Sequence, residues 1–273
     1  MCYAYGGMGR SRIRLDVLLA EKGVVESRNR AQALIMAGKV RVDGQVMTKP
    51  GVQVPGEAAI IIEQDLPYVS RGGLKLAAAL DEFTVDPIHA ICADVGASTG
   101  GFTDVLLQRG AARIYAIDVG YGQLDWKLRQ DERVVVMERT NARYLEALPE
   151  PVNLVTIDAS FISLKLILPV VKKWLTTPGL VVALIKPQFE AGQSQVGKGG
   201  VVRDRMIHRQ VLANMAEFAV NTGFKVLGLA LSPITGPAGN HEFFLRLGWQ
   251  TAQPSVEIAA SIEACLAKLE PAL

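Results

Sequence analysis

The sequence predicts an α/β protein in which a mostly parallel sheet carries helices on both faces and follows a small α+β module. Two observations predict the large sheet: apolar runs of strand length alternate with helical stretches, and a glycine-rich turn at residues 94–104 joins one such run to a helix. One observation predicts the small module. Residues 14–46 contain two short helical patterns and then a hairpin pattern.

Composition bounds the class of protein. The chain has 273 residues, of which 49% are hydrophobic and 21% charged, enough for one large domain and a small one. Its cysteines, Cys2, Cys92 and Cys265, lie far apart without metal-ligand spacing, so we expect no disulfide framework and no metal site. Residues 1–10 contain no signal-peptide core, and no apolar run is long enough to cross a bilayer. We therefore expect a cytoplasmic protein.

The first module has its own local signals. Residues 14–23 have helical apolar spacing and end at a glycine, and Ser27 is placed to cap a second helix that ends at Gly38. Asp43-Gly44 lies between alternating valines, which is a strong hairpin signal. Residues 10–50 contain nine lysines and arginines against four acids, a net charge of +5, and the rest of the chain carries −3. This asymmetry indicates that the module handles a polyanion.

Basic residues of the module are candidates for contacts with phosphates, although a solvated helix face is the alternative. They are Arg14, Arg28, Arg30, Lys39 and Arg41. The pattern R-L-D-x-x-L … S-R-x-x-A-x-x-L-I-x-x-G-x-V-x-V-D-G resembles the RNA-binding domain typified by ribosomal small-subunit protein four. The resemblance implies structured RNA as the ligand. It implies a domain at 12–63, and we expect a linker at 64–71.

The glycine-rich turn is the most informative segment of the larger domain. Asp94-Val-Gly-Ala-Ser-Thr-Gly-Gly-Phe-Thr-Asp104 follows an apolar run, and the next run ends in Asp118, an acid placed to bind a ribose diol. We expect Gly96, Gly100 and Gly101 to let the backbone turn sharply near a ligand. The spacing is not that of dinucleotide-binding proteins and is more like the cofactor loop of S-adenosylmethionine (SAM) methyltransferases. An ordinary tight turn is the alternative.

The remaining elements follow from apolar periodicity. We expect this domain to cover residues 72–250 and a helical tail to cover 251–273. Helices are predicted at 72–83, 101–109, 122–129, 164–174 and 204–221. Strands are predicted at 91–96, 113–118, 133–137, 153–158, 180–185, 224–230 and 242–247.

Polar residues at the carboxyl ends of these strands are candidate site residues, because ligands of open α/β sheets bind there. Asp158 and Lys186 each end an apolar run, and Asn141 follows the third strand. A single charge at a strand end can simply be solvated, but several at neighbouring ends favour a site. Lys75 could lie on the surface, and Glu242 could be an exposed strand residue.

Five segments, in this order behind the RNA-binding module, resemble the TlyA family, whose members are often labelled hemolysin A. They are Tyr68–Lys75, Asp94–Asp104, Ile157–Phe161, Ile185–Glu190 and Gly239–Glu242. The resemblance implies a SAM-dependent 2′-O-methyltransferase of ribosomal RNA, with cytidine as target and an FtsJ/RrmJ-like catalytic domain. It implies a Lys-Asp-Lys-Glu catalytic tetrad at Lys75, Asp158, Lys186 and Glu242.

The resemblance also suggests roles for these residues. We expect Lys186 to accept the proton of the 2′-hydroxyl or, as the alternative, to remain cationic and stabilise the developing alkoxide. We expect Asp158 to orient Lys186, and Lys75 with Glu242 to position the ribose. The backbone of residues 96–101 and the Ser98 side chain should then face the methionine part of SAM, Asp118 its ribose and Asn141 its adenine.

Two rival functions come from other classes. A membrane-lytic protein needs a strongly apolar amphipathic segment. The candidate, residues 256–269, contains Glu257 and Glu263 and is more typical of a packing helix. An inert RNA-binding or assembly factor would not need the complete tetrad and the glycine turn.

Overall fold

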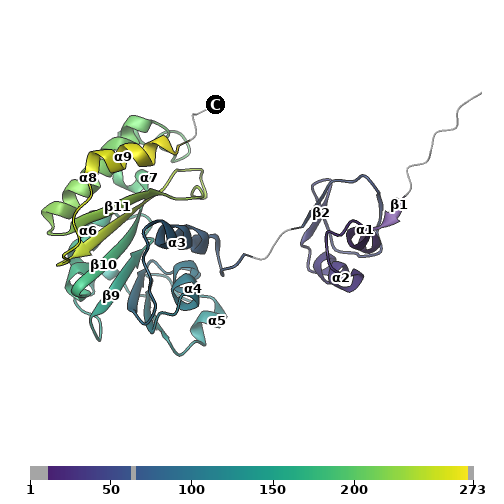
Figure 1. Cartoon of the computed structure of the whole chain (residues 1–273), viewed down its shortest axis with the longest axis horizontal. Coiled ribbons are helices and arrows are strands. Elements are labelled where there is room, and N and C mark those ends of the chain that lie inside the picture. The colour runs from purple at the N-terminus through teal and green to yellow at the C-terminus, as the bar shows by residue number, and fades with distance from the viewer. Residues whose placement is uncertain (1–11, 63–65, 270–273) are drawn as a thin grey trace, which may run out of the picture. The chain divides into compact units, whose positions relative to one another are not determined.

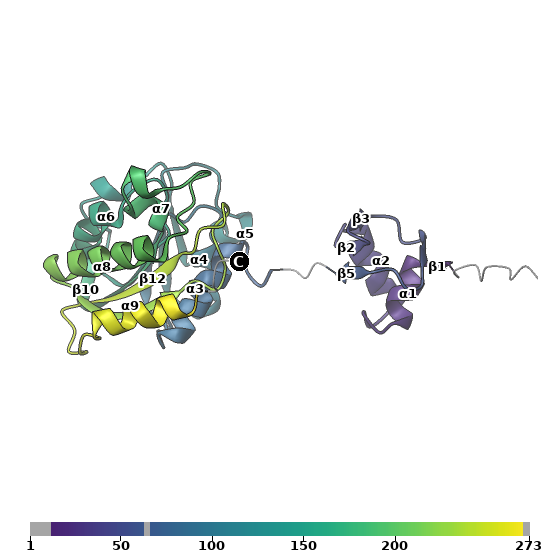
Figure 2. The same cartoon turned by 90° about the horizontal axis from the view of Figure 1, so that it is seen from above.

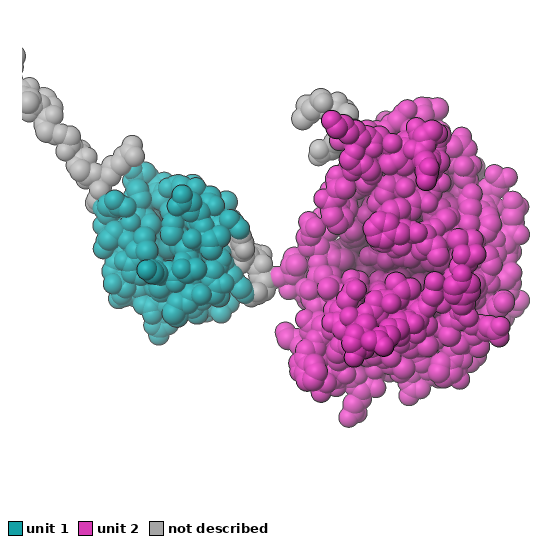
Figure 3. All heavy atoms as spheres, turned by 180° about the vertical axis from the view of Figure 1, so that it is seen from behind, with its two compact units in different colours: residues 1–65 teal, residues 66–273 magenta. Residues whose placement is uncertain are grey.

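The computed structural model describes residues 12–62 and 66–269, and the chain divides into two compact units, residues 1–65 and 66–273 (Figure 3). The N-terminal segment before residue 12, the first residues of the expected linker and the end of the C-terminal tail lie outside the described residues.

The smaller unit combines two short helices with five three-residue strands. A three-stranded antiparallel sheet has the order β3-β2-β5, and β1 pairs with β4. The predicted hairpin is confirmed around Asp43-Gly44, Ser27 accepts the capping hydrogen bond from the Arg30 amide, and Gly38 has a φ of 70°. Strands β1 and β4 were not predicted. The elements are β1 (Arg12–Arg14), α1 (Leu15–Glu21), α2 (Arg28–Met36), β2 (Val40–Val42), β3 (Gln45–Met47), β4 (Gln53–Pro55) and β5 (Ile60–Ile62).

The core of the smaller unit lies between the helices and one face of the small sheet. Leu15, Leu19 and Ile35 of the helices are fully buried, together with Val40. Because side chains alternate along a strand, Arg41 projects from the opposite face of the sheet. There it lies between Val46 and Ile61 of the neighbouring strands.

The larger unit contains a seven-stranded sheet with the order β11-β12-β10-β9-β6-β7-β8 (Figure 1). Strand β12 pairs antiparallel with both neighbours, and the other ladders are parallel. The predicted α/β class is confirmed. The elements are α3 (Arg71–Glu82), β6 (Ile91–Val95), α4 (Gly101–Gln108), β7 (Arg113–Ile117), α5 (Trp126–Arg129), β8 (Val134–Met137), β9 (Val152–Ile157), α6 (Leu164–Val171), β10 (Leu175–Ile185), α7 (Pro187–Glu190), α8 (Arg205–Asn221), β11 (Lys225–Leu231), β12 (Phe243–Trp249) and α9 (Ile258–Ala267), with 3₁₀ turns at 142–144, 172–174 and 193–195.

Each face of this sheet has its own hydrophobic core. Val181 and Ala183 of β10 belong to the core beneath α6, α8 and α9, whereas Val182 and Leu184 belong to the core beneath α3 and α4. This alternation explains why the central strands are apolar without interruption. Figures 1 and 2 show these two groups of helices on opposite faces of the sheet.

One predicted helix begins later in the structure than expected, and the predicted C-terminal helix is found. The helix expected at 122–129 is wrong in its first half, because Gly122 has a φ of 70° and Asp125 caps a helix that begins only at Trp126. At the C-terminus, α9 packs Ile262 and Leu266 into the core with α8, so this helix belongs to the larger unit.

Asp94 links three elements inside the sheet. It is fully buried on β6, where it accepts hydrogen bonds from Thr103 of α4 at 2.7 Å and Thr156 of β9 at 3.1 Å. Burial raises the pKa of Asp94 to about 7, although the threonine hydroxyls oppose this shift. The carboxyl group thereby holds the start of α4 against the end of β9.

The raised pKa predicts a pH dependence of stability. Between the ordinary value of 3.8 and about 7, the folded chain holds a proton on Asp94 that the unfolded chain releases. The free energy of unfolding should therefore fall as the pH rises through this interval. Asp94→Asn should remove this component, which urea titrations of both proteins across the interval will measure. Identical pH dependence in the two proteins would contradict the assignment.

Candidate active site

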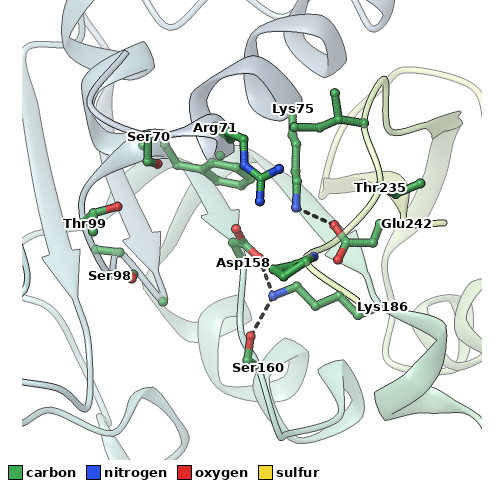
Figure 4. A pocket seen from close by; sticks show the side chains of 17 residues that line it. Ser70, Arg71, Lys75, Ser98, Thr99, Asp158, Ser160, Lys186, Thr235 and Glu242 are labelled. Atoms are coloured by element: carbon green, nitrogen blue, oxygen red, sulfur yellow. Dashed lines mark hydrogen bonds and ion pairs between the residues drawn. The ribbon is translucent and has the colours of Figure 1, made fainter. Parts of the chain in front are cut away.

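Two cavities adjoin at the carboxyl ends of the parallel strands. The smaller cavity, of about 290 Å³, lies between α3, the end of β10 and the loop before β12 (Figure 4). The larger cavity, of about 750 Å³, lies at the ends of β7, β8 and β9. Both are lined by the same four residues, Gly96, Ser98, Asp158 and Ser160. Ligands in the two cavities would therefore meet beside Asp158.

Lys75 and Glu242 form a buried ion pair in the wall of the smaller cavity. The Lys75 Nζ donates to Glu242 Oε2 at 2.6 Å, across 167 positions of sequence. Glu242 is 1% exposed and Lys75 is 7% exposed, so the surface alternative is wrong for both residues. Gly236 makes room for this pair, since a Cβ there would collide with the Glu242 carboxylate.

Lys186 and Asp158 form a second ion pair in the same cavity. Strands β9 and β10 are neighbours, and each ends just before one of these residues. Lys186 Nζ lies 2.6 Å from Asp158 Oδ1 and donates to Ser160 Oγ at 2.8 Å (Figure 4). The Lys186 side chain is 11% exposed and that of Asp158 is 21% exposed, so neither is a freely solvated strand end.

The glycine turn is held against the end of β9 and against Asp118. A Cβ on Gly96 would lie 2.6 Å from the Asp158 carbonyl oxygen, so this position requires glycine for a close approach of two backbones. Asp118 Oδ2 accepts from the Ser98 amide at 2.8 Å, and Oδ1 accepts from the Gly120 amide at 2.6 Å. The acid at the end of β7 thus fixes the turn and also lines the larger cavity.

The next two glycines make room for neighbouring side chains, and Gly101, unlike Gly100, also lines a cavity. A Cβ on Gly100 would collide with Leu128, and one on Gly101 would collide with the Ser70 hydroxyl. Gly101 therefore allows the starts of α3 and α4 to approach closely, and it also lines the smaller cavity. The cofactor contact expected of both glycines stays a prediction, and the structure gives Gly100 a packing role away from both cavities.

Asn141 lines the larger cavity and not the smaller one. It follows β8, accepts from the Arg143 amide at 3.0 Å and caps the 3₁₀ turn at 142–144. The cavity therefore has polar groups at Asp118 and Asn141, with apolar walls that include Ile117 and Ile162.

The structure adds residues that the sequence reasoning missed. Ser160 contacts Lys186, and Arg71 projects into the smaller cavity near Lys75 (Figure 4). Phe161 lines the larger cavity, with 89% of its surface exposed and a φ of 62°. Arg71 and Phe161 stand inside motif segments of the resemblance, and exposure could not be judged from sequence.

The five basic candidates of the smaller unit lie at different places in the fold. Arg14 and Arg28 converge on the buried carboxylate of Asp16. Arg30 is exposed on α2. Lys39 precedes β2, and Arg41 lies on the outer face of the small sheet.

Comparison with known proteins assigns both units. The profile of the S4 domain matches residues 13–60, and that of the FtsJ-like methyltransferases matches residues 68–249. The chain belongs to the FtsJ-like methyltransferase family. It is therefore an enzyme of the methyltransferase class that uses SAM, and its resemblance to the TlyA family is confirmed.

Several relatives match along most of their length. The 16S/23S rRNA (cytidine-2′-O)-methyltransferase TlyA of Mycobacterium tuberculosis is 47% identical, over 88% of this chain and 91% of that protein. Hemolysin A of Brachyspira hyodysenteriae is 42% identical, over 85% of this chain and 98% of that protein. A solved structure from Streptococcus thermophilus, provisionally described as a hemolysin, is 46% identical with a TM-score of 0.73, over 95% of this chain and 96% of that one.

The larger cavity fits the nucleoside part of SAM. A ribose diol needs a hydrogen-bond acceptor, which Asp118 would supply, and a flat base needs apolar walls, which Ile117 and Ile162 would supply. The shared wall at Gly96 and Ser98 leads from this cavity to Lys186.

A membrane-lytic protein needs a long apolar helix or a helix with an exposed apolar face. Within residues 12–62 and 66–269, no helix is both long and apolar enough to cross a membrane. The apolar face of α9 is buried against α8 and β11. The segment that the sequence offered as amphipathic is thus a packing helix.

Asp118→Ala should weaken SAM binding while the fold is retained. The substitution removes a carboxylate that faces the larger cavity and also frees the Ser98 amide. Loss of one hydrogen bond to a charged group corresponds to about 10- to 100-fold in affinity, which titration calorimetry with SAM will measure. Asp125→Ala is the matched control, because Asp125 caps α5 and lines neither cavity. Equal SAM affinity of Asp118→Ala and wild type would place the ribose contact elsewhere.

Proposed function

We propose that this enzyme transfers the methyl group of SAM to a ribose 2′-hydroxyl of ribosomal RNA, with cytidine as the target nucleoside. The observation that supports this most is the junction of the two cavities beside Asp158. A methyl donor in the larger cavity and a ribose in the smaller one would meet there, next to a lysine. The RNA-methylating relative gives the substrate class.

Lys186 is the residue that handles the proton of the hydroxyl. A ribose hydroxyl is a weak nucleophile and must lose its proton as the new bond to carbon forms. The Nζ of Lys186 faces the smaller cavity and is flanked by Asp158 Oδ1 and Ser160 Oγ. In one form of the proposal Nζ is neutral before the step and accepts the proton, and in the other it stays cationic and stabilises the developing oxyanion while water takes the proton.

Lys75 and Glu242 complete the proposed tetrad as a positioning pair. Their ion pair is nearly closed to solvent, and its two opposite charges compensate each other there. The pair also joins α3 to the loop before β12. The pair borders the same cavity as Lys186, where it can hold a ribose by hydrogen bonds. SAM supplies an electrophilic methyl group on a sulfonium when it is bound.

Phe161 offers a stacking surface for the target base. An 89% exposed phenyl ring is unusual in a cavity wall, and its neighbour Asp158 belongs to the proposed tetrad. A target nucleotide turned out of its helix would lose its stacking, and an aromatic ring would compensate this loss.

The S4 domain is the proposed RNA-binding module. Its match covers residues 13–60, which include the five basic candidates. Recognition would use phosphates and the shape of folded RNA.

Lys186→Ala should lose most of the methyl-transfer rate and keep SAM binding. General acid–base catalysis contributes about 10²- to 10⁴-fold. The single-turnover rate on ribosomal RNA should therefore decrease by a factor in that range relative to wild type. Mass spectrometry of nucleosides should identify 2′-O-methylcytidine as the wild-type product. Because the tetrad acts as a unit, Lys186→Ala combined with Asp158→Ala should be little slower than the single variant.

Lys225→Ala is the matched control for charge loss. Lys225 begins β11, at the opposite edge of the sheet from the cavities, and donates to the backbone of Thr251. Its rate should equal that of wild type. A Lys186→Ala enzyme with a near-wild-type rate would exclude the proposed proton acceptor, and absence of any 2′-O-methyl product from wild type would exclude the function.

Phe161→Ala should slow single-turnover methylation of RNA at saturating SAM, a condition that removes any effect on SAM affinity at this wall of the larger cavity. Base stacking on an aromatic ring contributes about 1–3 kcal/mol, or roughly 5- to 150-fold. Phe161→Tyr keeps a stacking ring and should restore most of the rate, whereas Phe161→Leu keeps only apolar area. Equal rates for the leucine and tyrosine variants would show that stacking is not the contribution.

A further inference from the structure

The smaller unit contains a buried carboxylate with an unusual set of partners. Asp16 of α1 is 0% exposed. Its Oδ1 accepts from Arg14 Nε at 3.0 Å, and its Oδ2 accepts from Arg14 Nη2 at 3.0 Å, Arg28 Nε at 3.0 Å and Gln32 Nε2 at 2.8 Å. The hydrogen bonds from Arg14 hold the pKa of Asp16 well below its usual range, against the effect of burial. Asp16 is therefore ionised at neutral pH.

The two arginines use only part of their hydrogen-bonding capacity on Asp16. Arg14 has its Nη1 group left over, and Arg28 has both of its Nη groups left over. Their side chains are 44% and 52% exposed, so these remaining groups can face solvent. Gly51 borders the Arg14 Nη1 group, 3.3 Å from the position that a Cβ would take, so a side chain there would crowd this edge.

Holding two guanidinium groups beside each other normally costs free energy. Two like charges repel, and each long side chain must give up rotamers. Asp16 offsets the repulsion with its negative charge and fixes both side chains before any ligand arrives. Gln32 stands one turn after Arg28 on α2 and holds the same carboxylate oxygen from another side.

We propose that Asp16 is a positioning residue that preorganises Arg14 and Arg28 as a two-arginine clamp for RNA phosphates. The inference rests on the proposed RNA binding by this unit. Guanidinium groups bind phosphate oxygens through parallel N–H donors, and the Nη groups left free by Asp16 are suited to this geometry. A purely structural ion cluster between α1 and α2 is the competing explanation.

The direction in which Asp16→Asn changes RNA affinity distinguishes a long-range charge effect from a loss of positioning. Asp16→Asn raises the net charge of the unit by one, which by long-range attraction alone would tighten RNA binding. Loss of preorganisation predicts the opposite, a loss of about tenfold for two side chains that must now be ordered on binding. Glu21→Gln is the matched control, because it makes the same change of charge at an exposed position of α1. Binding of a fluorescein-labelled folded RNA hairpin to the full chain, across a series of salt concentrations, is the measurement.

A double-mutant cycle separates positioning from a structural role. In the background Arg14→Gln with Arg28→Gln, no guanidinium remains to be positioned, so adding Asp16→Asn should change affinity less than about twofold. That background should also lower the slope of affinity against salt by about 1–2, whereas Asp16→Asn alone should leave the slope near that of wild type. SAM affinity should be unchanged throughout.

The results of these experiments test the arginine clamp separately from the proposed RNA binding by the smaller unit. Equal or tighter RNA binding by Asp16→Asn would overturn the clamp while RNA binding by the unit stands. An equal loss in both backgrounds would overturn it too, because the effect would then come from general destabilisation. Failure of wild type to bind the hairpin would overturn the proposed RNA-binding role itself. Weaker binding that depends on the two arginines, with Glu21→Gln unaffected, is the result that supports the clamp.

Discussion

The close approach of the Gly96 backbone to the carbonyl group of Asp158 brings the two cavities of the larger unit together. A side chain at position 96 would push β6 and β9 apart at their carboxyl ends, where both cavities share their wall. Asp94 reinforces this contact from inside the sheet, since its carboxyl group holds Thr103 and Thr156. The position of the residues proposed to react thus depends on backbone packing at the ends of β6 and β9.

The two lysine–acid pairs differ in their exposure to solvent, which favours different roles for them. Lys75 and Glu242 are almost fully removed from water, and a buried pair of this kind is costly to break once formed. Lys186 and Asp158 retain contact with solvent and share a third partner, Ser160. The open pair leaves the Lys186 side chain within reach of a ligand, which agrees with the proposal that Lys186 takes part in the chemical step and Lys75 in positioning.

The sequence predicted the strand-end residues well because a parallel sheet places all its carboxyl ends at one edge. Asp118, Asp158 and Lys186 follow from this rule without knowledge of side-chain contacts. The pairing of Lys75 with Glu242 does not follow from it, since it joins a helix and an antiparallel strand that are far apart in sequence. The start of α5 was mispredicted because apolar spacing outweighed the turn signal of Gly122, which has a positive φ. The exposure that distinguishes Phe161 depends on the tertiary structure and cannot be predicted from apolar periodicity in the sequence.

Asp16 is another residue whose surroundings could not be predicted from the sequence, here in the proposed RNA-binding unit. In sequence it is one acid in a basic segment and would be counted against affinity for a polyanion. In the structure it is buried beneath two arginines and directs their remaining donors. Net charge therefore describes how strongly the unit attracts RNA from a distance, whereas the internal acid bears on how well its cations fit phosphates at contact. Under the proposed function, phosphate contacts of this kind would be made equally before and during methyl transfer, so they would contribute to capture of the RNA and not to the rate of the chemical step.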